Sequence, residues 1–259
     1  MRMALATRYV TPLREGGSLP GLMEADDDGL YVVKFRGAGQ GPRALVAELL
    51  GGEIARALGL PMPDIVFIEL DPALGRNEPD YEIRSLILAS AGRNLGIDFL
   101  PGALPYSAAA PPPLDADLAS RIVWFDGFVS NVDRTARNTN MLMWHRQLHL
   151  IDHGAALYFH HNWETAGRLA ESAFPAIRNH VLLPWADAIE AAAEASRERL
   201  NRDVFAAILD DVPDGWLTPE HSIPDAPAKR AAYVGFLTRR LDASSNFVQE
   251  AVNARASLV

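Results

Sequence analysis

The stretch from Ser130 to Leu142, SNVDRTARNTNML, carries the residues with the clearest capacity for chemistry. Asp133 and Asn138 stand five positions apart in it, after an apolar run and before a strand-like segment. A carboxylate and an amide at this spacing are typical of loops that orient an attacking hydroxyl and hold Mg²⁺ during phosphoryl transfer. The stretch therefore predicts a catalytic loop.

A second carboxylate fits the same chemistry. Asp152, in LIDHG, follows Asn138 by 14 residues and ends the second strand of a predicted hairpin. Mg²⁺ prefers oxygen ligands, commonly one or two carboxylates together with phosphate oxygens. Asn138 and Asp152 are therefore the predicted metal ligands.

A cation for phosphate is predicted in the N-terminal third. Lys34 lies in the strand-like YVVKF, on the face opposite Tyr31 and Val33, and the helix that follows offers Glu48 and Glu53 as partners. Spacing alone does not choose between the two acids. Upstream, a glycine-rich stretch could approach phosphates closely because glycine has no side chain; its glycines are Gly16, Gly17 and Gly21.

The elements around these residues form two groups. Strands are predicted at 4–13, 30–35 and 64–70 and a helix at 42–58, with a candidate hinge at 71–80. Beyond it the pattern predicts helices at 81–91 and 116–131, an irregular loop at 96–114, a hairpin at 141–152, and three or four helices after residue 164. We predict an α+β, two-lobed fold, with a small β-rich N-lobe at 1–72 and a larger helical C-lobe at 73–259; the resemblance described below implies that this fold is protein-kinase-like.

The composition excludes several classes of protein. The chain has 259 residues, 49% of them hydrophobic, a net charge of −9 and no cysteine. It can bury a large core, it lacks the overall basic charge for sequence-independent nucleic-acid binding, and disulfides are impossible. No apolar run is long enough to span a membrane, so we expect a soluble, cytoplasmic protein without membrane insertion. Five of its seven histidines lie between 145 and 161, and we interpret them as packing and surface residues rather than metal ligands.

Four segments together resemble the HipA-like serine/threonine kinases, which are distantly similar in fold to protein kinases and phosphatidylinositol 4-kinases. They are FDGFVSNVDRTARNTNML, LIDHG, YVVKF and AELLGGEIARALGLPMP, and the resemblance covers roughly residues 6–160. It implies that Asp133 is the catalytic base and that Lys34 pairs with phosphate, with Glu48 favoured as its partner. It also implies a phosphate loop at Gly16, Gly17 and Ser18, with Ser18 a candidate for autophosphorylation, and adenine contacts at Glu69 and Leu70.

The chain departs from the family pattern in three places. We expect it to lack the small N-terminal subdomain of full-length members. Its GGSLPG is not a close match to a G-x-G-x-x-G loop, and His153 stands where protein kinases have Phe. The predicted function is transfer of the γ-phosphate of ATP, with Mg²⁺, to a protein Ser/Thr hydroxyl. Two alternatives stay open: a nucleotide-binding pseudokinase that acts through interactions, and a kinase for a small-molecule or lipid hydroxyl. For Arg134 and Arg137, contact with phosphate or substrate and pairing with nearby carboxylates are equally compatible with the sequence.

Overall fold

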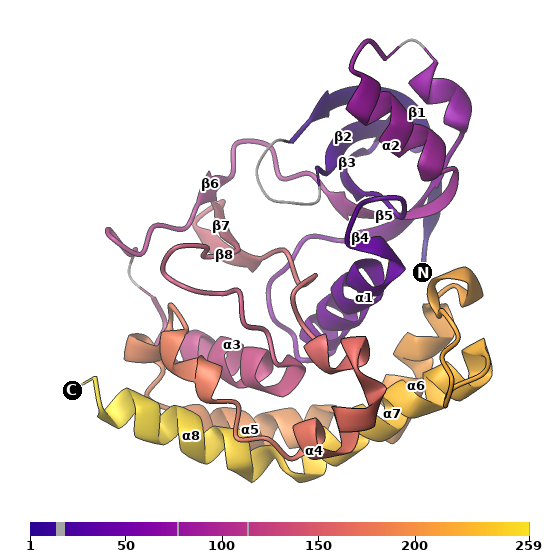
Figure 1. The fold of residues 1–259 in the computed structure, drawn as a ribbon. Coiled ribbons are helices and arrows are strands. Elements are labelled where there is room, and N and C mark those ends of the chain that lie inside the picture. Colours follow the sequence, from indigo (N-terminus) through magenta and orange to yellow (C-terminus); the bar gives the residue numbers. More distant parts are fainter. Residues whose placement is uncertain (14–18, 77, 113, 259) are drawn as a thin grey trace.

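The N-terminal part of the chain is a five-stranded closed barrel. The computed structural model describes residues 1–13, 19–76, 78–112 and 114–258. The strands run in the order β1 (Met3–Pro12), β2 (Gly21–Ala25), β3 (Leu30–Lys34), β5 (Gly92–Asp98) and β4 (Ile65–Leu70). All pairs are antiparallel except β1 with β4, whose parallel pairing closes the barrel (Figure 1).

Side-chain alternation decides which face of β3 enters the barrel. Tyr31 and Val33 are buried in the barrel core with Phe35, as the sequence predicts, and Lys34 is directed to the other side. Close strand packing also requires Gly96, because a Cβ there would lie 2.6 Å from Cγ1 of Ile68. The barrel therefore holds β3 in a register that delivers Lys34 outside the core.

The barrel extends beyond the N-lobe boundary predicted at residue 72. The helix α2 (Tyr81–Ala89) packs Ile83 and Ile87 onto the barrel core, and β5 pairs with both β3 and β4. Neither β2 nor β5 was predicted. Their sequences, GLMEA and GRNLGID, contain glycines and polar residues that interrupt the alternation on which strand prediction depends.

The rest of the chain is mainly helical. Below α1 (Gly41–Ala57) lie α3 (Ala116–Val129), α4 (Ala166–Ala170), α5 (Ile189–Arg199), α6 (Arg202–Asp211), α7 (Ala226–Asp242) and α8 (Ser244–Ala256) (Figure 1). A small sheet of β6 (Leu104–Pro105), β7 (Met141–Trp144) and β8 (Gln147–Leu150) lies beside them. Short 3₁₀ turns occur at Pro72–Gly75, Tyr158–His161, Trp163–Thr165, Pro175–Asn179, Leu183–Trp185 and Asp214–Trp216.

Most of the predicted helices and the hairpin are confirmed. Asp115 caps α3 by accepting a hydrogen bond from the backbone N–H of Asp117, and the tight turn between β7 and β8 places His145 and Arg146 in the left-handed region. Two predictions were wrong. The segment 96–114 contains the end of β5 and all of β6, and five α-helices, not three or four, lie between residue 164 and residue 258.

One buried arginine fixes the end of α3, from which the predicted catalytic loop departs. The Arg240 side chain, on α7, is fully buried and donates to the carbonyl oxygens of Gly127 (2.7 Å), Phe128 (3.3 Å) and Ala170 (3.3 Å). Burial lowers the pKa of Arg240 to about 10. A cation at these helix-end carbonyls stabilises the C-terminal turn of α3.

Across the ranges that the structure describes, no helix combines the length and apolar character needed to cross a lipid bilayer.

Candidate active site

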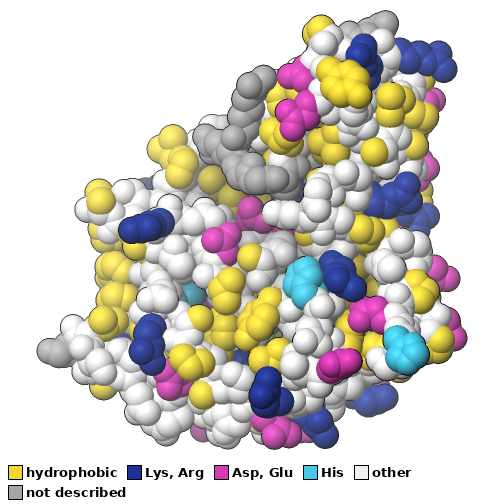
Figure 2. Space-filling view, in the orientation of Figure 1, with side chains coloured by type: hydrophobic (Ala, Val, Ile, Leu, Met, Phe, Trp, Pro, Cys, Tyr) yellow, Lys and Arg dark blue, Asp and Glu magenta, His cyan; other side chains and the backbone are white. Residues whose placement is uncertain are grey.

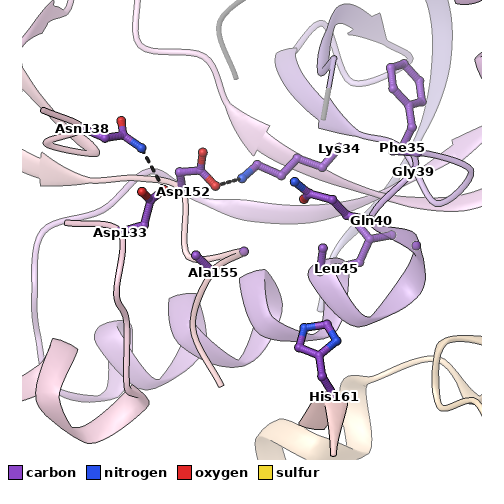
Figure 3. A pocket seen from close by; sticks show the side chains of 14 residues that line it. Lys34, Phe35, Gly39, Gln40, Leu45, Asp133, Asn138, Asp152, Ala155 and His161 are labelled. Carbon is purple, nitrogen blue, oxygen red and sulfur yellow. Dashed lines mark hydrogen bonds and ion pairs between the residues drawn. The ribbon is translucent and has the colours of Figure 1, made fainter. Parts of the chain in front are cut away.

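A cleft opens between the barrel and the helical part. Its volume is about 590 Å³, and its lining includes Lys34 from β3, the loop residues Asp133 and Asn138, and Asp152 after β8. The face on which it opens carries acidic side chains near a histidine and a basic side chain (Figure 2). The close view shows Lys34 reaching Asp152 from one side of the cleft and Asn138 reaching Asp133 on the other (Figure 3).

The end of β3 and the middle of α1 meet in a buried ion pair. The Nζ of Lys34 donates to Oε2 of Glu48 (2.7 Å) and to Oδ1 of Asp152 (2.6 Å). Glu48 is 1% exposed, and it also accepts from the backbone N–H of His153 (2.8 Å). Glu53 instead contacts Arg56 on the same helix (3.3 Å). The structure thus selects Glu48 as the partner that sequence spacing could not choose.

The electrostatics of this pair keep both groups charged. Burial alone would raise the pKa of Glu48, but the Lys34 ammonium and the interaction with His153 together outweigh burial, and the pKa of Glu48 falls to about 2. Burial would likewise lower the pKa of Lys34, but Glu48 and Asp152 raise it. Lys34 therefore presents a fixed positive charge to the cleft.

Three asparagines hold Asp133 in the loop after α3, two through its carboxylate and one through its backbone. Oδ2 of Asp133 accepts from Nδ2 of Asn138 (2.8 Å) and of Asn140 (3.1 Å), and Oδ1 of Asn131 accepts from the Asp133 backbone N–H (3.1 Å). Asn138 is exposed, while Asn131 and Asn140 are buried. Asn131 and Asn140 thus shape the loop, and Asn138 and Asp133 face the cleft.

The two arginines of the loop have different surroundings. Arg134 is buried and pairs with the buried carboxylate of Asp126 on α3, with Nε 2.5 Å from Oδ2. Arg137 is exposed. For Arg134, the structure therefore favours pairing with a carboxylate over contact with phosphate.

The donor set in the cleft is compatible with Mg²⁺. Asp133, Asn138 and Asp152 all present oxygen atoms to one cavity, and Asp152 keeps 46% of its side chain exposed. No group of three or more His, Cys, Asp or Glu side chains in the described ranges is arranged to hold a metal by itself. Because Mg²⁺ is commonly held by one or two carboxylates plus phosphate oxygens, the residues fit a metal that arrives with a nucleotide.

Some predicted site residues do not line this cleft. Glu69 and Leu70 lie in β4 and pair across the sheet with Arg93 and Gly92 of β5. The chain then stays with the barrel until β5 ends at Asp98, so the predicted hinge at 71–80 is wrong and the connection to the helical part follows β5. Gly16, Gly17 and Ser18 lie outside the described residues.

The structure adds a wall that the sequence did not identify as part of the site. Ala38 to Gly41 and the first turn of α1 line the cleft together with His161 (Figure 3). A Cβ added at Gly39 would meet nothing within 4 Å, and Gly41 has a φ of +68°. The signal in the sequence is RGAGQGP, a glycine-rich run directly before a helix.

Comparison with known proteins identifies the family. The model of the HipA-like kinases matches residues 7–242. The chain belongs to the HipA-like kinase family. As a HipA-like kinase, it is a phosphotransferase of the kinase type, which confirms the resemblance carried by its sequence motifs.

Two solved structures show the same fold. The proinflammatory kinase CtkA of Helicobacter pylori is 12% identical, with a TM-score of 0.53 and coverage of 92% of this chain and 94% of that one. The Golgi casein kinase with Mn/ADP bound is 11% identical, with a TM-score of 0.56 and coverage of 100% of this chain and 76% of the casein kinase chain. At these identities the likeness establishes a kinase-like fold of mixed helices and strands and no more. No curated protein matches the chain in a sequence search.

Proposed function

We propose that this HipA-like kinase transfers the γ-phosphate of ATP, with Mg²⁺, to a Ser or Thr hydroxyl of a protein. The observation that carries the proposal is that Lys34, Asp133, Asn138 and Asp152 face one cavity although they come from three separate parts of the chain. The barrel is then the small lobe and the helical part the large lobe of a two-lobed kinase, with the nucleotide between them. The Golgi casein kinase, whose structure has Mn and ADP bound, supports the use of a nucleotide with a divalent metal on this fold.

Each side chain has one task in this proposal. Lys34, held by Glu48, pairs with phosphate oxygens. Asp133 accepts the proton of the acceptor hydroxyl and aims its oxygen at the phosphorus. Asn138 and Asp152 hold the metal, which when bound neutralises charge on the phosphate oxygens. Little covalent chemistry is required of the chain, because positioning and charge neutralisation supply most of the rate.

The direct test is Asp152→Asn in an assay with radiolabelled Mg·ATP and a mixture of generic protein acceptors. The expected result is a loss of at least about 10³-fold in phosphoryl transfer, since a metal contributes several kcal/mol to the transition state. Asp210→Asn, at an exposed position on α6, is the matched control and should transfer at the parent rate. Parent-like turnover by folded Asp152→Asn would refute the mechanism.

The acceptor class is decided by repeating this assay with small-molecule and lipid hydroxyls beside the protein acceptors. ATP binding without transfer to any acceptor would instead support the pseudokinase alternative. Transfer to a small-molecule or lipid hydroxyl but not to protein would show that the acceptor is of that class and not a protein. Ser18 stays a predicted autophosphorylation site, and intact-mass analysis with peptide mapping after incubation with ATP tests it; phosphate mapped elsewhere, or absent, removes it.

A further inference from the structure

A buried polar network lies beneath the catalytic loop. Oδ2 of Asp126 accepts from Nε of Arg134 (2.5 Å) and from Nε2 of His180 (2.8 Å), and its Oδ1 accepts from Nδ2 of Asn131 (2.9 Å). The backbone N–H of Leu182 donates to Nδ1 of His180 (3.0 Å), so the imidazole carries its proton on Nε2. Burial alone would raise the pKa of Asp126, but Arg134 and His180 lower it, so the carboxylate stays ionised.

The other edge of the Arg134 guanidinium joins the two segments that carry the site carboxylates. Its Nη1 donates to the carbonyl oxygen of Asn140, whose side chain donates to Asp133, and to the carbonyl oxygen of Ile151 (3.4 Å), which directly precedes Asp152. The rigid, planar Arg134 guanidinium thus contacts the backbone of both segments: the one that carries Asp133 and the one that carries Asp152. A lysine could keep the charge, but its single ammonium lacks the fork that reaches these partners together with Asp126.

The Arg134 side chain itself is absent from the cleft lining. It is 1% exposed. Burying a charged pair contributes little net stability compared with apolar residues of the same size, so stability alone does not account for this arrangement.

We infer that Arg134, held by Asp126 and His180, is a positioning residue that sets the spacing of Asp133 relative to Asp152. The inference rests on the proposed function, in which the spacing between Asp133 and Asp152 aligns the acceptor hydroxyl with the metal-bound phosphate. A displacement of about 1 Å at such a site can cost on the order of 10²-fold in rate.

The kinetic test compares Arg134→Lys with Arg137→Lys, the same change at the exposed arginine three positions later. Arg134→Lys should lower kcat on the order of 10²-fold, with the KM for ATP within about threefold of the parent. Arg137→Lys should retain the parent kcat. Folded Arg134→Lys with a parent-like kcat, or with a loss confined to KM, overturns the inference.

A second readout needs no turnover. Hydrogen exchange of the amides at 131–141 and 151–154 should be at least about tenfold faster in Arg134→Lys than in the parent and Arg137→Lys, while barrel amides are unchanged. Equal exchange rates at these amides in Arg134→Lys and in the parent overturn the inference. If the parent transfers no phosphate, the proposed function fails on its own, and exchange still decides whether Arg134 joins the two segments.

If Arg134→Lys does not fold, His180→Phe and His180→Gln replace it. His180→Phe removes the Nε2–H donor to Asp126 and should reproduce the faster exchange at 131–141, whereas His180→Gln keeps a donor and should restore most of the protection. Parent-like exchange in both variants counts against the network.

Discussion

The two sides of the cleft are supported in opposite ways. On the barrel side, Lys34 itself faces the cleft, and its ion pair with the buried Glu48 also holds the structure together. On the helical side these tasks are divided: Asp126 and Arg134 are buried beneath the loop, while Asp133 and Asn138 face the cleft. Substitutions on the barrel side should therefore change stability and activity together, whereas the helical side should allow them to be changed separately.

Lys34→Met is expected to have the largest effect. It leaves the Glu48 carboxylate buried without its cation, which typically costs about 3–5 kcal/mol of folding free energy, and it removes the phosphate-pairing charge. The double variant Lys34→Met/Glu48→Gln should regain much of that stability and none of the phosphoryl transfer. Urea unfolding measures the stability of the two variants, and a phosphoryl-transfer assay measures their activity. Equal stability of the single and double variants would contradict the idea that the Lys34–Glu48 pair serves both stability and catalysis.

The dependence of unfolding on acid pH should report the stability that the Lys34–Glu48 pair contributes. The pKa of Glu48 is about 2 in the folded protein and ordinarily 4.5. At 1.36 kcal/mol for each pH unit, the difference corresponds to about 3 kcal/mol of stability. Because the folded-state pKa is the lower one, this contribution is complete above pH 4.5 and is lost as the pH falls towards 2. Urea midpoints measured from pH 6 to pH 2 should decline less steeply in Glu48→Gln than in the parent; parallel curves would show that Glu48 is not the group responsible.

Asn138→Ala should separate function from support. Asn138 is exposed, so the free energy of unfolding should change by no more than about 0.5 kcal/mol. Loss of a metal ligand should raise the Mg²⁺ concentration for half-maximal activity about tenfold, the equivalent of about 1.4 kcal/mol of metal binding. Asn179→Ala, at another exposed position, is the control. An unchanged Mg²⁺ requirement would remove Asn138 from the metal site.

The smallest effect is expected on the outer face of the barrel. Arg8 and Glu24 form an ion pair there (Nε to Oε2, 2.8 Å), with side chains 62% and 43% exposed. Solvent and salt screen such pairs, so Arg8→Ala should leave the melting temperature and the rate of transfer within measurement error. A clear loss of stability would show that the contrast between buried and exposed pairs is overstated.

Much of this molecule could be predicted because its signals are local. The strand at YVVKF, the helix at 116–131 and the hairpin before Asp152 could each be recognised from a few neighbouring residues, and the order of the motifs carried the family resemblance. The strands β2 and β5 were missed because their glycines and polar residues break that alternation. Missing β5 in turn placed the hinge directly after β4, at 71–80, and the adenine contacts at Glu69 and Leu70.

The sequence by itself determined which chemistry is available: a lysine, two carboxylates and an asparagine at intervals suited to phosphoryl transfer. Only the tertiary structure decided how they meet. Lys34 and Asp152 are 118 positions apart, and their 2.6 Å contact depends on the register of a closed barrel packed onto a helical part. The choice of Glu48 over Glu53 and the burial of Arg134 depend on the same packing, because local periodicity orients a side chain relative to its own helix or strand but does not say which distant segment will cover it.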